Sequence, residues 1–203
     1  MRKTPQHFKR LETKKVIEEI LQKNKTSLSP LAIITSENLN ENFTTTSFSF
    51  LESLDGEESQ VNIENKRGKG FIDGLFTGLH EHYSQSYESL KDIKLVNLKV
   101  NPVLSAARNS IGTDAQASVL FSLHIKNHGI SEFHHKSRSM IHSSFNLALE
   151  AFQFYINCER VFDKIQILIA EAQSRNRGDI VSDYIYKLSK ITEVNSYEKR
   201  REG

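Results

Sequence analysis

The spacing of apolar residues changes several times along the chain, and each change marks a predicted element. Between residues 6 and 24, apolar residues recur at helical spacing with charged residues between them, which predicts an amphipathic helix. Residues 27–30 contain serines and a proline, and we expect them to break this helix. A short apolar run follows at 31–34, and the polar stretch 36–42 is predicted to be a linker.

The next part of the chain has the period of β-strands joined by a tight turn. Residues 48–50 alternate between phenylalanine and serine, and residues 61–63 alternate in the same way on a returning strand. Asp55-Gly56 between them is typical of a hairpin turn, because glycine accepts the positive φ that such turns require. A helical pattern over 71–83 and a further strand at 95–100 follow.

The same succession then recurs. Residues 116–126 alternate between apolar and polar apart from Leu120, residues 127–129 form a turn, and 130–136 form the return strand. One apolar face over 140–155 predicts a second helix. Because strand, hairpin, strand and helix occur twice, the sequence predicts the α+β class: a duplicated ββαβ-type unit of sheet and packed helices, with extra helices at both ends.

Two more helices are predicted near the C-terminus, at about 159–172 and 179–193, and the basic tail 199–203 is expected to be disordered. These patterns divide the chain into three parts: an N-terminal helical arm and linker at 1–42, a central domain at 43–158, and a C-terminal helical extension with its tail at 159–203.

Composition narrows the class of protein. The 203 residues include 27 Lys+Arg and 25 Asp+Glu, a near balance that disfavours nucleic acid as a partner even though Arg175, Arg177 and the tail are basic. No apolar run approaches the ~20 residues that a membrane-spanning helix needs, and the first residues lack the apolar segment of a signal peptide. Cys158 is the single cysteine, which excludes an internal disulfide. We therefore expect a cytoplasmic globular protein.

No group of side chains predicts catalysis or metal binding. His80 and His82 diverge on a predicted helix, and His134 and His135 point to opposite faces of a predicted strand. Cys158 ends an apolar helical face, where a buried and unreactive thiol is expected. No serine lies in a G-x-S-x-G setting. We predict no catalytic residue, no metal and no cofactor.

Two glycine-containing turns are the candidate binding segments. The turn at 68–73 runs into a helix, whose free N–H groups and dipole favour an anion such as a carboxylate. The alternative is a tight turn that Asp73 caps and that holds no ligand. Gly70, Gly74 and Gly78 add a row of small residues along this helix. The second segment, at 112–117, places small residues at the start of a strand and leaves room beside it.

Together these segments resemble the C-terminal regulatory (dimerisation) domain of the 2-isopropylmalate synthase and citramalate synthase family, over about residues 43–158. In that family the domain pairs with a second copy and binds the feedback inhibitor, leucine or isoleucine. Carried over by motif, the resemblance implies an effector site made of Gly68, Gly70, Ile72, Asp73, Leu98, Thr113, Asp114, Ala115 and Ala117.

The resemblance also implies what the chain lacks. The family's catalysis belongs to a (β/α)₈ barrel of ~250 residues, which this chain is too short to contain. The expected function is a non-catalytic regulatory module that forms a homodimer, binds a branched-chain amino acid and acts with a separate barrel-type acyltransferase. Lys69 and Phe71 stand where the family has asparagine and proline, which favours the alternative of a dimeric scaffold that has lost effector binding.

Overall fold

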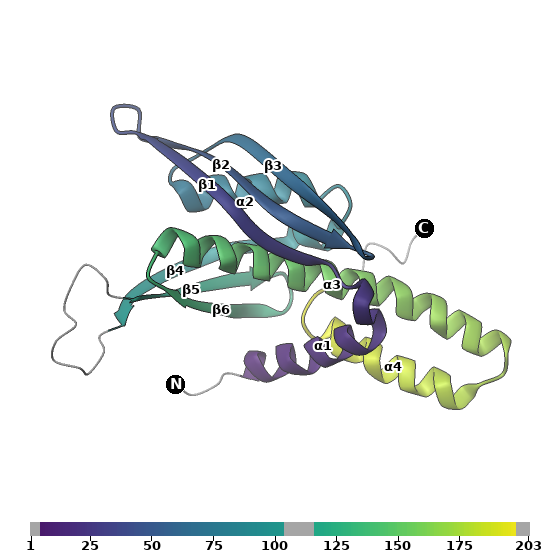
Figure 1. Ribbon diagram of the computed structural model, residues 1–203. Coiled ribbons are helices and arrows are strands. Elements are labelled where there is room, and N and C mark those ends of the chain that lie inside the picture. Colours follow the sequence, from purple (N-terminus) through teal and green to yellow (C-terminus); the bar gives the residue numbers. More distant parts are fainter. Residues whose placement is uncertain (1–4, 104–115, 198–203) are drawn as a thin grey trace.

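The computed structural model describes residues 5–103 and 116–197, and it places two helices between two antiparallel sheets (Figure 1). The first sheet contains, in order, β1 (Ser27–Asn38), β2 (Phe43–Leu54) and β3 (Glu57–Gly68). The second contains β4 (Ile93–Val103), β5 (Gln116–Ile125) and β6 (Gly129–Ser137). The helices between them are α2 (Phe71–Tyr83) and α3 (Met140–Ser174). The predicted disordered tail at 199–203 lies outside the described residues.

The α+β class predicted from the sequence is confirmed, but the order of elements differs from the expected ββαβ unit. Each half contains three strands followed by a helix, because residues 27–38 form β1 instead of a helix break and a linker. Pro30 is tolerated there because it lies beside an irregularity of an edge strand, where a missing N–H costs no ladder hydrogen bond. The strand predicted at 95–100 is β4, the first strand of the second sheet.

Phenylalanines tie each helix to the sheet of the other half. Phe76 of α2 contacts Phe121 of β5, with ring centroids 5.6 Å apart. Phe145 of α3 contacts Phe48 of β2, with centroids 5.5 Å apart. Both phenylalanines occupy the sixth position of their helix. The two sheets and the two helices therefore share one hydrophobic core.

Two glycines of α2 allow this helix to lie close to the first sheet. A Cβ added at Gly78 would lie 2.9 Å from side-chain atoms of Ile63 and Phe48. A Cβ at Gly74 would lie 3.0 Å from the carbonyl oxygen of Lys66. These are the close approaches that only glycine permits, so two members of the glycine row serve helix-to-sheet packing.

The terminal segments complete the same core. The helix α3 is continuous over 35 residues, although the sequence predicted two helices that meet near Cys158. The helices α1 (Pro5–Leu21) and α4 (Gly178–Thr192) pack against it and against each other. After α4 the chain turns inward, and the ring of Tyr197 stacks on Phe162 at 4.4 Å between centroids. The boundary predicted at 158 thus falls inside one helix.

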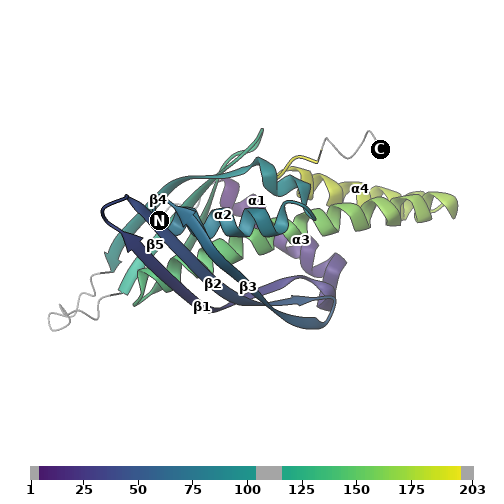
Figure 2. The same cartoon turned by 90° about the horizontal axis from the view of Figure 1, so that it is seen from above.

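None of the helices described in Figures 1 and 2 combines the length and the apolar character needed to cross a bilayer.

A partly buried histidine makes the stability of this core depend on pH. The ring of His80 lies 5.0 Å from that of Phe152, and burial lowers the pKa of His80 below its ordinary value of 6.5. The unfolded chain therefore binds a proton near pH 6.5 that the folded protein binds only at lower pH. We expect the free energy of unfolding to fall as the pH drops below about 6.5 and this loss to end below the folded pKa.

Denaturant unfolding measured from about pH 7.5 to pH 5 tests this dependence. A His80→Gln variant should show a flatter profile than the original protein, whereas His124→Gln, at an exposed position of β5, should not. Equal pH profiles for His80→Gln and the original protein would contradict the expectation.

Candidate effector site

The predicted site lies at the end of the molecule where both central helices begin. Figures 1 and 2 show α2 and α3 side by side, with their first turns toward the same end. At this end Ala117 of β5 pairs with Pro102 of β4 on one side and with Ser137 of β6 on the other. The structure therefore brings residues from both halves of the chain to one end.

The turn between β3 and α2 has backbone donors that no side chain covers. Gly70 is the N-cap residue of α2 and provides no capping side chain. The N–H of Gly74 donates to the carbonyl of Gly70 at 3.1 Å, which begins the helical ladder. The N–H groups of Phe71 and Ile72 precede that ladder and have no intrahelical acceptor. They form a positively polarised helix start that suits an anion.

Asp73 lies in the same first turn. Its Oδ2 accepts a hydrogen bond from the backbone N–H of Lys69 at 2.9 Å, so the side chain holds the turn closed. This is the contact expected for a structural cap. Asp73 itself is exposed, and Oδ1 takes no part in that hydrogen bond.

The two glycines of the turn have different surroundings. A Cβ at Gly68 would lie 2.6 Å from the backbone nitrogen of Gly74, so β3 and α2 approach too closely for any side chain. A Cβ at Gly70 would meet no described atom within 4 Å. Packing within the described residues therefore requires glycine at 68 and does not require it at 70.

Exposed apolar residues lie on the second sheet, on the face that α2 contacts through Phe76. Leu98 of β4 lies directly opposite Phe121 of β5, and Phe121 contacts Phe76, one helical turn after Ile72. Leu98 is 40% exposed and Val100 39% exposed, although both lie on the sheet face that the helices cover elsewhere. The structure thus places the predicted Leu98 and Ile72 on facing elements.

The start of α3 adds apolar residues that the sequence reasoning missed. Met140 is 41% exposed and Ile141 37% exposed. Ile141 is the second residue of α3, as Ile72 is of α2, so alignment of the two halves could have identified it. Val100 was also missed.

Side chains hydrogen-bond to the first turn of α3, whereas no side chain of the N-cap residue caps the first turn of α2. The hydroxyl of Ser139, the N-cap residue, accepts from the N–H of His142 at 3.2 Å. The hydroxyls of Ser137 and Ser143 lie 2.8 Å apart, and His135 Nδ1 lies 3.2 Å from Ser143 Oγ. Because these groups satisfy one another, α2 is the one of the two central helices whose start is open.

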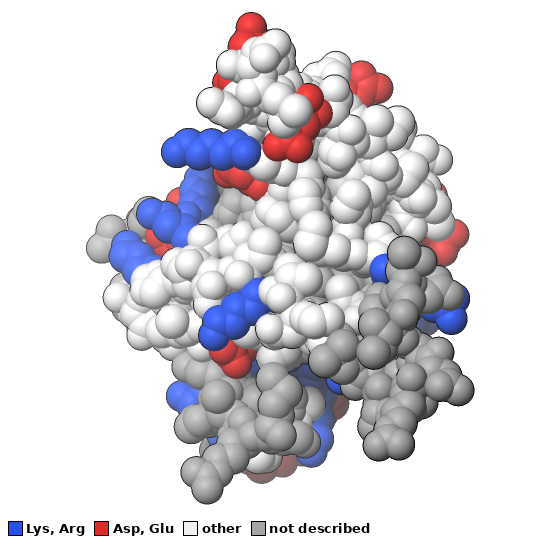
Figure 3. Space-filling view, turned by 90° about the vertical axis from the view of Figure 1, so that its left-hand side faces the viewer, with Lys and Arg blue, Asp and Glu red and all other residues white. Residues whose placement is uncertain are grey.

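Three of the predicted residues, Thr113, Asp114 and Ala115, lie outside the described residues. Figure 3 shows this end of the molecule, where both basic and acidic side chains border a largely uncharged surface. Lys69 and Arg138, both exposed, follow the ends of β3 and β6. Lys69, the residue before Gly70, places a positive charge beside the open start of α2, which favours an anionic group there.

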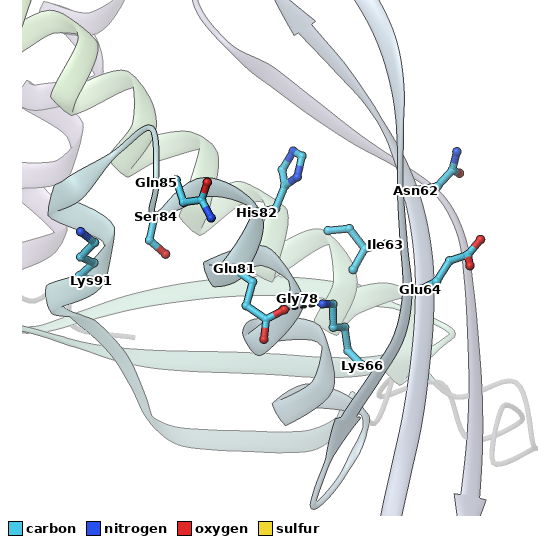
Figure 4. A pocket seen from close by; sticks show the side chains of 10 residues that line it. All are labelled: Asn62, Ile63, Glu64, Lys66, Gly78, Glu81, His82, Ser84, Gln85 and Lys91. Carbon is cyan, nitrogen blue, oxygen red and sulfur yellow. Dashed lines mark hydrogen bonds and ion pairs between the residues drawn. The ribbon is translucent and has the colours of Figure 1, made fainter.

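A separate cavity of about 720 Å³ lies between β3 and the second half of α2 (Figure 4). An ion pair between Lys66 and Glu81 crosses it. Its lining consists of Asn62, Ile63, Glu64, Lys66, Gly78, Glu81, His82, Ser84, Gln85 and Lys91. It contains none of the predicted site residues, and its charged lining does not suit an aliphatic ligand.

The groups considered for catalysis and metal binding are dispersed. Within the described ranges, no three His, Cys, Asp or Glu side chains gather as metal ligands do. Cys158 is fully buried, and burial raises the pKa of its thiol, which keeps it protonated and unreactive. No family model and no curated protein matches the chain.

Proposed function

We propose that the protein is a non-catalytic regulatory module that dimerises and binds a branched-chain amino acid, leucine or isoleucine, where α2 begins. In this proposal catalysis belongs to a separate barrel-type acyltransferase of branched-chain amino-acid biosynthesis. The observation that carries the proposal is Gly70, a glycine at an open helix start with no described neighbour that requires it. A ligand that approaches the backbone closely would require it.

The site has a suitable group for each part of an amino acid. The N–H groups at the start of α2 would receive the carboxylate, with Lys69 beside them. Asp73 Oδ1 would accept from the ammonium group. An aliphatic side chain would cover Leu98, Val100 and Ile72, whose exposed apolar surface gains from being removed from water. Neutral side chains should therefore be preferred over charged ones.

The contact of Asp73 with Lys69 favours a second function, a dimeric scaffold without an effector. The carboxylate of Asp73 already satisfies one backbone donor of the turn, and its negative charge opposes an anion nearby. In the scaffold the turn would serve only to join β3 to α2. The two functions predict different responses to amino acids.

We expect leucine or isoleucine to raise the melting temperature of the full chain. A ligand at about 100 times its dissociation constant stabilises the fold by ~2.7 kcal/mol. For a chain of this size, each kcal/mol is worth about 2–4 °C. A thermal-shift screen of the twenty amino acids measures this effect.

Two glycine variants locate the binding. Gly70→Val should remove the shift, because its side chain would cover the helix start. Gly178→Val is the matched control: it also lies at a helix start in open space, at the beginning of α4, and should keep the shift. No shift with any amino acid, in a folded protein, would leave the scaffold function.

A further inference from the structure

The two sheets have four outer edges, and three of them are covered or carry the features that prevent pairing with another strand. The edge of β6 is covered by α1, where the guanidinium of Arg10 donates to the carbonyl of Glu132. The edge of β4 carries Lys94 and Lys99 and has an irregularity after Leu95. Charges, bulges and covering helices are the usual protection of exposed edges.

The edge of β3 is protected in the same way. Its first residues, Glu57 and Glu58, and its later residues, Lys66 and Arg67, are charged. Asn65 has a φ of 53°, where the pairing with β2 shifts. Another strand could not pair regularly along its whole length.

Beyond the irregularity of β1 at Leu31, the following residues 32–36 have no such protection. Residues 31–36 contain no charge and no proline, and they include the β-branched Ile33, Ile34 and Thr35. Leu31 is 48% exposed and Ile34 71% exposed. Figures 1 and 2 show β1 at the border of its sheet, and among the described strands β2 is its only neighbour. An uncharged, β-branched edge of this kind is a template for strand addition.

We propose that β1 pairs with β1 of a second copy, antiparallel about a two-fold axis near Ile34. This joins the two first sheets into one continuous sheet of six strands. The inference deepens the proposed function, on whose dimer it rests, by naming the surface through which the module dimerises.

The distribution of charges along β1 favours a second copy of the chain as the partner that pairs with this edge. A two-fold axis sets residues near it opposite themselves, so a charged residue there would face a like charge. The segment 31–36 is free of charge, and the nearest charged residue is Glu37. Ile34 pairs with Ser47 of β2, and its neighbour Ile33 pairs with the buried Phe48, so Ile34 lies on the outer face. Two Ile34 side chains would therefore contact each other across the axis.

Sedimentation of the full chain at micromolar concentration tests the proposal. We expect a dimer for the original protein and at least ~10-fold weaker association for Ile34→Lys, which sets two lysines opposite each other. The matched control is Ile130→Lys, 51% exposed on the outer face of the second sheet, which should remain dimeric. A monomeric original protein, or an Ile34→Lys variant that associates as strongly, would overturn the proposal.

Cysteine crosslinking tests the register independently of the lysine variant. Facing residues of antiparallel strands have Cα atoms about 4.5–5.5 Å apart, within the range for a disulfide. The experiment compares the rate of covalent-dimer formation under copper-phenanthroline oxidation. It uses three variants of β1 and the control Ile130→Cys; the β1 variants are Ala32→Cys, Ile34→Cys and Ser36→Cys. The fully buried Cys158 leaves each variant with one reactive thiol.

Rapid formation of a covalent dimer by Ile34→Cys supports the proposal, and no crosslinking above the Ile130→Cys control overturns it. Failure of amino-acid binding would leave both readouts unchanged, so the interface and the effector site are tested separately.

Discussion

Asn157→Ala should destabilise the protein by about 3–5 kcal/mol, because it leaves two buried backbone groups without partners. Asn157 lies in the middle of α3 and is 3% exposed. Its side-chain oxygen accepts from the N–H of Thr26 at 2.8 Å, and its amide donates to the carbonyl of Thr26 at 2.8 Å. These two hydrogen bonds hold the chain where it enters β1.

Denaturant unfolding measures the effect, with Asn146→Ala as the control. Asn146 lies on the same helix and makes one hydrogen bond, from Nδ2 to the carbonyl of His142 at 2.9 Å. Because its side chain is partly exposed, we expect a loss below about 1 kcal/mol. Similar losses for both variants would show that the contact of Asn157 with Thr26 contributes little.

Gly68→Val should destabilise the protein by more than about 3 kcal/mol, whereas Gly70→Val should change its stability by less than about 0.5 kcal/mol. The obstacle at Gly68 is backbone: a Cβ would lie 2.6 Å from the nitrogen of Gly74, which cannot move without shifting α2. Nothing in the described structure lies near a Cβ at Gly70, and its φ of −167° is an ordinary extended value.

The two substitutions are the same and lie two residues apart, so each is a control for the other. Thermal unfolding without ligand is the measurement. If both variants have the melting temperature of the original protein, the close approach of β3 to α2 is not required for folding. If both are equally destabilised, Gly70 has a structural role and its use as a probe of ligand binding fails.

Alternation and turn residues were sufficient to predict five of the six strands, because one face of each sheet is buried and the other is exposed. The strand β1 was missed because Pro30 and the serines around it are typical of a break, and the sequence does not show that the proline lies on an edge. Simple alternation along the strand predicted at 95–100 also fails at one point, because the irregularity after Leu95 sets Leu95 and Leu98 on the same face.

The long helix α3 was divided in the prediction because Asn157 and Glu159 interrupt its apolar pattern. Both side chains are buried, and both form hydrogen bonds with residues far away in the sequence. Glu159 accepts from the N–H groups of Glu88 and Ser89 at 3.1 and 3.0 Å. A polar residue whose partner lies about 70 or 130 positions away cannot be assigned from local periodicity.

The sequence alone was enough to predict the part of the candidate site between β3 and α2, because Gly68, Gly70, Ile72 and Asp73 lie in one turn. The sequence could not predict that apolar residues of the second sheet are exposed, because their exposure depends on how much of that sheet the helices cover. Leu98 and Val100 have the pattern of core residues and lie beyond that cover.

The uninterrupted length of α3 has a mechanical consequence. At about 1.5 Å per residue its 35 residues form a rod of roughly 52 Å, which starts beside the candidate site and ends at the turn into α4. A rod acts as a lever: a tilt of about 3° about its first turn would move its far end by roughly 3 Å. A small displacement at Met140 would thus be enlarged at Ser174, and the helices packed along the rod would have to follow or resist it.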